Sequence, residues 1–362
     1  MHTDLNLRRV AGTVALMATS AGVLGALASP AGAQTGASAV LQDGIVVVTG
    51  TEVNDRIGLT SDANQLVVDF GFDGTVDAQF ARASYRAARV QALGGADNLS
   101  LRGSGDVPIT MSGNAGGDVV SVSGSIGETG EGDAATTLNG NGGNDRLFAT
   151  APGPVTVQAG AGDDLVRGGE AGIGRETISL GDGNDRFISS LNTFVGDRSD
   201  VVDGGAGQDS LQAEGTFADE GLNLSAEAGK LVMRHNFRDR IDADNVEDVR
   251  WIGFGGLDAG DAVSVNDLTG TDVVRFTPDF SAGPGIARPN GSADNLTVRG
   301  TDGVDRITVT GSGSDLTVAG LTPLVTAVFV EPHDFLLIDT LGGNDVVDTS
   351  GLQPGLVQLL QR

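Results

Sequence analysis

The sequence has no cysteine, one lysine (Lys230), one Trp and one Tyr, and each shortage excludes a class of protein. Without cysteine the chain forms no disulfides and performs no thiol chemistry. Only 22 basic residues stand against 48 acidic ones, for a net charge of −26. This charge opposes nucleic-acid binding, because contacts to phosphates need a basic face. The few aromatic residues offer little surface on which neutral sugars could stack.

Glycine and aspartate are abundant. Glycine supplies 57 of 362 residues, about twice its usual share, and only 10 of the 48 acidic residues are Glu. Asp favours turns and metal-binding loops, whereas Glu favours helix surfaces, so the composition disfavours a helical bundle. Because 39% of residues are hydrophobic and they recur in short runs, the chain is expected to fold.

The N-terminus resembles a secretory signal peptide. Arg8 and Arg9 end a short basic region, residues 10–28 are weakly apolar, and small residues at 29–33 provide a cleavage site. We therefore predict a signal peptide over residues 1–33, cleavage after Ala33 and a secreted, extracellular product. A twin-arginine signal is an alternative. No later segment is apolar enough to span a membrane.

One phrase recurs along the chain: a Gly/Asn-rich turn, an Asp, and then alternating apolar residues. Six copies follow one another at separations of about 20 residues, and related phrases contain Asp261 and Asp345. The alternation predicts short strands bounded by Gly-rich turns. The aligned aspartates of the six copies are Asp97, Asp118, Asp145, Asp164, Asp185 and Asp209.

Strands of three to five residues without helical segments between them cannot build a βαβ sheet. We predict an all-β, elongated, right-handed parallel β-solenoid of the β-helix or β-roll type, with equivalent turns stacked along one edge. A longer module recurs at both ends, since residues 50–101 and 300–348 share the order of their phrases. The expected divisions are a signal peptide (1–33), solenoid repeats (34–216), an irregular junction or hairpin (217–252) and further repeats (253–362).

The stacked turns are suited to calcium. Ca²⁺ takes six to eight oxygen ligands, and oxygens on opposite sides of the ion lie about 5 Å apart, close to the spacing of neighbouring strands. A stack of ionised Asp side chains would also be destabilised by repulsion unless cations intervene or the side chains splay outward. We therefore expect Ca²⁺ to bind between the turns. The expected ligands are Asp97, Asp118, Asp145, Asp164, Asp185, Asp209, Asp261 and Asp345.

Two of these segments, residues 140–147 (GNGGNDRL) and 204–211 (GGAGQDSL), resemble the hemolysin-type (RTX) calcium-binding repeat, GGxGxDxUx, in which U is a large apolar residue. The resemblance implies a secreted bacterial protein with a parallel β-roll, in which the motif Asp and turn carbonyls bind Ca²⁺. This sequence departs from that family because its phrase returns every ~20 residues rather than every nine.

Other interpretations remain open. Gly, Asn and Asp form tight corners without any metal. Parallel β-helices include polysaccharide lyases and hydrolases, but no nucleophile motif is present, and His235 and His333 are expected to be surface, packing or solvated residues rather than catalytic ones. We therefore predict a calcium-binding structural protein and not an enzyme. A surface adhesin with a cell-surface or polysaccharide partner is the third alternative.

Overall fold

The computed structural model describes residues 36–103, 107–124, 134–151, 153–169, 175–191, 199–216, 218–236, 239–254 and 260–362. The expected signal peptide, residues 1–33, lies outside this part of the chain. Within it the protein is all-β: the structure contains 30 strands and one 3₁₀ turn (Arg82–Ser84), and the described residues form no α-helix.

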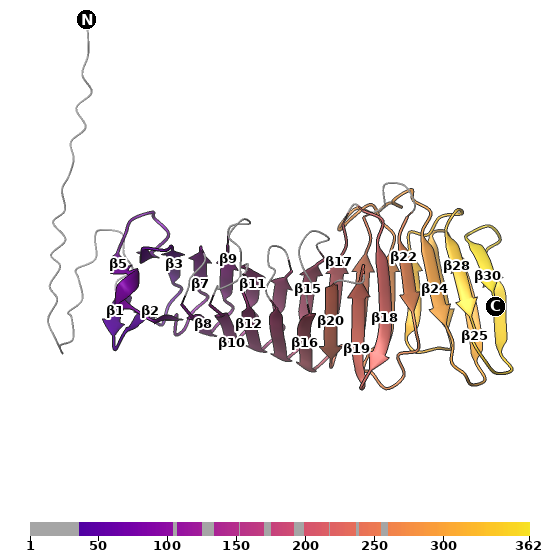
Figure 1. Cartoon of the computed structure of the whole chain (residues 1–362), viewed down its shortest axis with the longest axis horizontal. Helices are drawn as coiled ribbons and strands as arrows, with labels where there is room; N and C mark the ends of the chain where they lie inside the picture. The colour runs from indigo at the N-terminus through magenta and orange to yellow at the C-terminus, as the bar shows by residue number, and fades with distance from the viewer. Residues whose placement is uncertain are drawn as a thin grey trace, which may run out of the picture.

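The strands form two long sheets in an elongated molecule (Figure 1). Through much of the chain successive strands alternate between the sheets, so that one strand of each makes up a layer. Most neighbouring strands are parallel, as expected. Sheet A has the order β1 (Ser38–Gln42), β2 (Ile45–Thr49), β6 (Ala87–Gln91), β8 (Ile109–Ala115), β10 (Thr136–Gly142), β12 (Val155–Ala161), β14 (Glu176–Asp182), β16 (Ser199–Ala206), β20 (Asp239–Asp244), β19 (Lys230–His235), β18 (Gly221–Glu227), β22 (Ala262–Val265), β24 (Asn295–Arg299), β28 (Phe335–Asp339) and β30 (Gln358–Gln361).

Sheet B also has 15 strands, and the register of its parallel pairs keeps like positions of the repeat opposite one another. Its order is β29 (Val346–Leu352), β25 (Arg306–Ser312), β26 (Asp315–Ala319), β27 (Leu324–Val328), β23 (Arg275–Asp279), β21 (Asp248–Ile252), β17 (Ser210–Glu214), β15 (Arg186–Ser190), β13 (Leu165–Gly168), β11 (Arg146–Thr150), β9 (Val119–Ser123), β7 (Asn98–Arg102), β3 (Arg56–Ser61), β4 (Gln65–Phe70) and β5 (Ala78–Ala81).

The alternation of apolar residues decides which face of each strand is buried. In β12, Val155, Val157 and Ala159 are buried, while the residues between them are not. Parallel neighbours in register place equivalent side chains above one another, so the buried residues join into one apolar cluster from Val46 to Val357. The core therefore runs along the whole molecule and continues from each layer to the next.

Three antiparallel meanders interrupt the parallel pattern. They are β3–β4–β5, β18–β19–β20 and β25–β26–β27, and in each the first strand also pairs in parallel with a later strand. The first and third belong to the modules that recur at residues 50–101 and 300–348. The second lies within residues 217–252, where we expected an irregular junction or hairpin. There β18 and β19 pair as an antiparallel hairpin, and β20 extends it into a third copy of the module's meander, placed in sheet A.

The turns bring backbone very close to backbone. Gly143 has φ +119°, and a Cβ atom there would lie 1.9 Å from the carbonyl oxygen of Gly116 in the preceding layer. Gly116 meets the carbonyl of Gly95 in the same way, at 1.7 Å. Only glycine allows this approach, so these turn glycines are required by the layer spacing itself.

We expect Gly143→Ala to destabilise the protein more than Gly313→Ala. Both positions have positive φ, but a Cβ at Gly313 would meet nothing within 4 Å. The conformational cost of alanine is larger at Gly143, because its φ of +119° lies outside the left-handed region, near which Gly313 lies at +71°. Gly143→Ala also adds a steric clash that we expect to cost a further ~1–3 kcal/mol. Denaturant unfolding of both variants measures the difference. Equal loss of stability would show that the stacked carbonyls do not impose glycine at this turn.

Candidate functional site

The predicted aspartates of the first repeats form a hydrogen-bonded column between layers. The backbone N–H of each donates to the Oδ1 atom of the next: Asp118 donates to Asp145, and Asp145 to Asp164, both at 2.7 Å. Glu247 ends the series by accepting from Asp209 at 2.7 Å. This set, called here the Asp column, comprises Asp55, Asp97, Asp118, Asp145, Asp164, Asp185 and Asp209.

The column side chains point inward. Each is at most 3% exposed. Except in Asp55, Oδ1 accepts the N–H of a neighbouring layer, whereas Oδ1 of Asp55 accepts the hydroxyl of Thr51. Six of the seven keep a buried second oxygen with no hydrogen-bond partner among the described residues. These are the Oδ2 atoms of Asp97, Asp118, Asp145, Asp164, Asp185 and Asp209.

Burial raises the pKa of these carboxyl groups. The pKa of Asp145 rises to about 7, and those of Asp97, Asp185 and Asp209 to about 6, chiefly because burial disfavours the charged form; donated N–H bonds oppose the rise. Ionised neighbours one layer apart would repel by roughly 3 kcal/mol at an effective dielectric of about 20. A proton or a cation is therefore needed to neutralise the column.

The glycine five residues before several of these acids makes room for the second oxygen. A Cβ on Gly140 would lie 2.2 Å from Oδ2 of Asp145, and one on Gly113 would lie 2.1 Å from Oδ2 of Asp118. The carboxylate therefore packs directly against the glycine backbone. This contact explains why the position five residues before the Asp is a glycine.

The other two predicted ligands lie apart from the Asp column. Asp261 belongs to a second series, in which Glu220 donates to Asp261 at 3.0 Å and Asp261 to Asp294 at 2.8 Å. Asp294 then donates to Asp334 at 3.0 Å. Burial raises the pKa of Asp261 to about 8, and its Oδ2 has no partner among the described residues.

Asp345 lies in a third place, the last layer, where it accepts from the N–H of Asp305 at 2.9 Å. It is only half-buried. The eight predicted residues therefore occupy three separate series. The structure adds acidic members that the repeat phrase did not predict as ligands: Asp55, Glu220, Glu247, Asp294, Asp305 and Asp334.

A short motif marks the first acid of each module. In Gly-Thr-x-x-x-Asp/Glu the threonine N–H and hydroxyl both donate to the carboxylate four residues later: Thr51 to Asp55, Thr216 to Glu220 and Thr301 to Asp305. Both oxygens of Asp55 and Asp305 thus have partners within their own turns, whereas Glu220 is bonded only through Oε1 and its Oε2 has no hydrogen-bond partner among the described residues. Comparison of residues 50–55, 215–220 and 300–305 would have found all three modules.

A second row of side chains crosses the outside of the same turns. Oδ1 of Asn144 accepts from the N–H of Asp163, Oδ1 of Asp163 from Asn184, and Oδ1 of Asn184 from Gln208. These contacts are exposed. Asn and Asp side chains therefore stabilise the corners by accepting hydrogen bonds from the backbone of the neighbouring layer. One row of these side chains is buried and the other is at the surface.

The atoms along the column that could bind a metal ion are carboxylate and carbonyl oxygens, the ligands that Ca²⁺ prefers. Among the described residues, however, no three or more His, Cys, Asp or Glu side chains are grouped closely enough to hold a metal ion. The fit to calcium therefore rests on the unpartnered Oδ2 atoms, which recur from layer to layer, together with backbone carbonyls. A shell of three carboxylates is not part of the described structure.

The histidines considered for catalysis and the Trp and Tyr residues considered for sugar stacking are buried, apart from His333. His235 is buried rather than at the surface, between Glu220 (Nε2 to Oε1 3.2 Å) and Asp239 (Nδ1 to Oδ2 3.3 Å). Burial alone would lower its pKa, but bonds to these two carboxylates raise it to about 9. Trp251 and Tyr85 are buried and offer no surface for sugar stacking. His333 is exposed, with Nε2 2.9 Å from the carbonyl oxygen of Ser292.

No protein-family model, curated protein or solved structure matches this chain. The resemblance to the hemolysin-type repeat therefore remains a prediction from the motif. In the described part of the chain, the structure has no helix with the length and apolar character needed to cross a membrane.

We expect Asp145→Ala to destabilise the protein more than Asp145→Asn. The alanine leaves the buried N–H of Asp118 without its acceptor, at an expected cost of ~1–3 kcal/mol, whereas asparagine retains an oxygen at this place. Denaturant unfolding at pH 5, where the wild-type carboxyl is largely protonated, gives the comparison. Equal destabilisation would show that the bond between layers contributes little.

In calcium-free buffer we expect stability to fall as the pH rises from about 5 to 8. Asp145 has a folded pKa of about 7, above the unfolded value of about 3.9. Its contribution is therefore complete below about pH 4 and is lost as the pH rises through 7. His235, raised to about 9, acts in the same direction between about pH 6.5 and 9.

Thermal unfolding of the wild type, Asp145→Asn and Asp163→Asn across this range measures the effect. Asp163 is an exposed neighbour of the column, so its variant is the matched control. Asp145→Asn should flatten the pH dependence and Asp163→Asn should not. A wild-type melting temperature that rises from pH 5 to 8 would contradict the buried-carboxyl explanation.

Proposed function

We propose that this protein is an exported structural protein, a right-handed parallel β-solenoid in which Ca²⁺ stabilises the buried carboxylates between layers. The observation that carries this proposal is the repeated, buried and unpartnered second oxygen of the Asp column. A stack of such oxygens favours a cation over ionised carboxylates alone. The alternation of strands between two facing sheets supports the solenoid.

The residues that would hold calcium are neighbouring members of the Asp column, through their Oδ2 atoms, with backbone carbonyls completing the ligands. Their Oδ1 atoms continue to accept backbone N–H groups. Bound calcium would supply charge neutralisation at pH 7, where Asp145, with a pKa of about 7, is partly ionised. Outside the cell calcium is plentiful, so folding would be completed after export.

We expect Ca²⁺ to raise the melting temperature at pH 7.5, with half the effect at roughly 10⁻⁴ to 10⁻³ M, the range of extracellular calcium modules. Binding to the folded state alone stabilises by about 2.7 kcal/mol per site at 100 times Kd. Calorimetry and circular dichroism with calcium, magnesium or chelator measure the response. The double variant Asp145→Asn/Asp164→Asn should lose most of it.

Asp163→Asn, which changes one exposed acid beside the column, is the matched control and should retain the full response. A melting temperature unchanged by calcium up to about 10⁻² M, together with strong stabilisation on acidification, would overturn the calcium proposal. Protons would then be what neutralises the column. A calcium response that survives in the double variant would place the ions elsewhere.

A further inference from the structure

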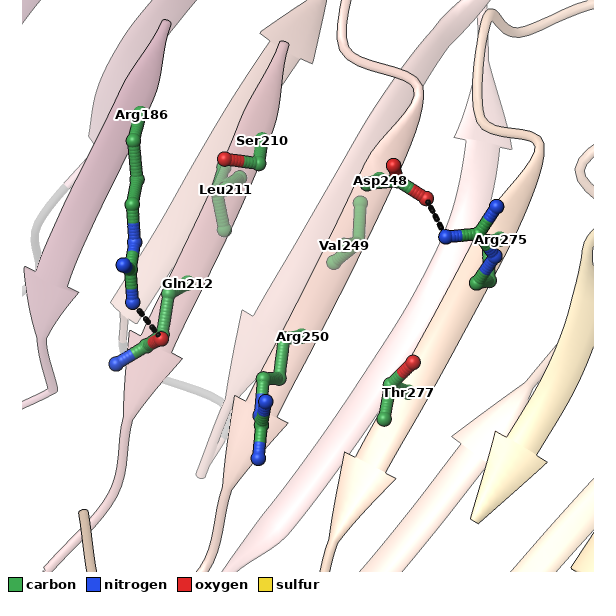
Figure 2. Close-up of a pocket in the computed structure, with 9 residues that line it drawn as sticks. All are labelled: Arg186, Ser210, Leu211, Gln212, Asp248, Val249, Arg250, Arg275 and Thr277. Atoms are coloured by element: carbon green, nitrogen blue, oxygen red, sulfur yellow. Dashed lines mark hydrogen bonds and ion pairs between the residues drawn. The ribbon is translucent and has the colours of Figure 1, made fainter. Parts of the chain in front are cut away.

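One face of this acidic protein carries a group of arginines. Arg186 of β15, Arg250 of β21 and Arg275 of β23 surround a shallow depression of about 310 Å³ on the outer face of sheet B (Figure 2). All three arginines are exposed, and Asp248 is the one acidic residue that lines the depression. The lining therefore has an excess of positive charge within a chain of net charge −26.

Two of these arginines are paired with carboxylates, and the third, Arg186, faces an uncharged amide. Arg275 pairs with Asp248 at 3.1 Å, and Arg250 pairs with the buried Asp279. Arg186 hydrogen-bonds to the neutral side-chain oxygen of Gln212, as Figure 2 shows. A guanidinium that faces an amide keeps its full charge and can bind a carboxylate through two parallel N–H bonds.

Arg186 and Arg275 lie in one row that follows the long axis of the molecule, and Arg250 lies beside this row, opposite Gln212. The strand register aligns Arg186 with Ser210, Asp248 and Arg275 in one row across β15, β17, β21 and β23. In the other direction Arg146 of β11 occupies the same row, two strands from Arg186. With strands about 4.8 Å apart, Arg146 and Arg275 lie roughly 24 Å apart. A row of this length fits an extended chain better than a single small anion.

The net charge of the whole protein limits which class of charged polymer can bind to this face. A net charge of −26 opposes a densely charged polymer such as duplex DNA, with one charge per ~1.7 Å. A polysaccharide with carboxylates on its sugar units is less densely charged, and its hydroxyls can bond to side chains such as Ser210, Gln212 and Thr277. The lining contains no aromatic residue, so recognition would depend on charge and hydrogen bonds.

We propose that the outer face of sheet B from β11 to β23 binds an extended acidic polysaccharide, whose carboxylates pair with Arg146, Arg186, Arg250 and Arg275. The site uses outward-facing residues, separate from the buried Asp column, and does not depend on the calcium proposal. It gives the solenoid a binding face that runs along its length.

The probe is an oligogalacturonate of about ten sugars, with its fully methyl-esterified form as the neutral control. Calorimetry at low salt should show binding of the acid form alone. Arg186→Gln/Arg250→Gln should weaken it about tenfold or more, and Arg89→Gln should not. Arg89 is an exposed arginine on β6 of sheet A.

The titration is run in chelator and repeated in about 1 mM CaCl₂, with the native circular dichroism spectrum required of every variant, so that loss of binding is separable from loss of calcium-dependent folding. The proposal is overturned if the folded wild type does not bind the acid form, or binds the esterified form equally. It is also overturned if the double variant binds like the wild type, or if single-stranded DNA of the same charge binds more tightly.

Discussion

The hydrogen bond from a backbone N–H to an Asp side chain in the next layer is the interaction on which the rest of the structure depends. It ties successive layers together at the turn, where strand pairing ends and backbone donors would otherwise lack partners. Because the acceptor is a side chain two or three atoms from the backbone, the bond requires the layers to be in register. The same register stacks the apolar side chains into one continuous core.

Burying a column of Asp side chains between the layers has an electrostatic cost. A column of inward carboxylates has to be neutral or compensated, and the raised pKa values of Asp145 and Asp261 express that cost. At the start of the first and third modules, a threonine donates to both oxygens of the carboxylate, Thr51 to Asp55 and Thr301 to Asp305. The second carboxylate oxygens of Asp97 to Asp209 have no such donor among the described residues, so a proton or a cation is needed at these positions.

The outer surface has different chemistry from the turns. The Asp column is buried, and much of the remaining acidic charge lies on exposed turns, whereas outward positions on sheet B include several arginines. A residue directly after a column Asp, such as Arg146 or Arg186, alternates to the outer face because successive side chains of a strand point to opposite sides. The phrase Asn-Asp-Arg therefore contributes one residue to the outer corner, one to the buried column and one to the open face.

The sequence by itself determined the all-β class, the short parallel strands and the stacking of Asp97 to Asp209, because Gly-rich turns, apolar alternation and constant spacing are local signals. It did not determine where those carboxylates point. Only the tertiary structure turned them into the core and onto the N–H of the next layer, placed Asp261 and Asp345 in separate series, and brought His235 between Glu220 and Asp239. The strand pairing of the meander at β18–β20 was also decided there, although the Gly-Thr-x-x-x-Asp/Glu motif marks the start of this module in the sequence. Side-chain direction and the partners of buried charges depend on segments far apart in the sequence, such as the 42 residues between Asp55 and Asp97 and the 47 between Arg167 and Glu214. A local sequence pattern does not contain these contacts.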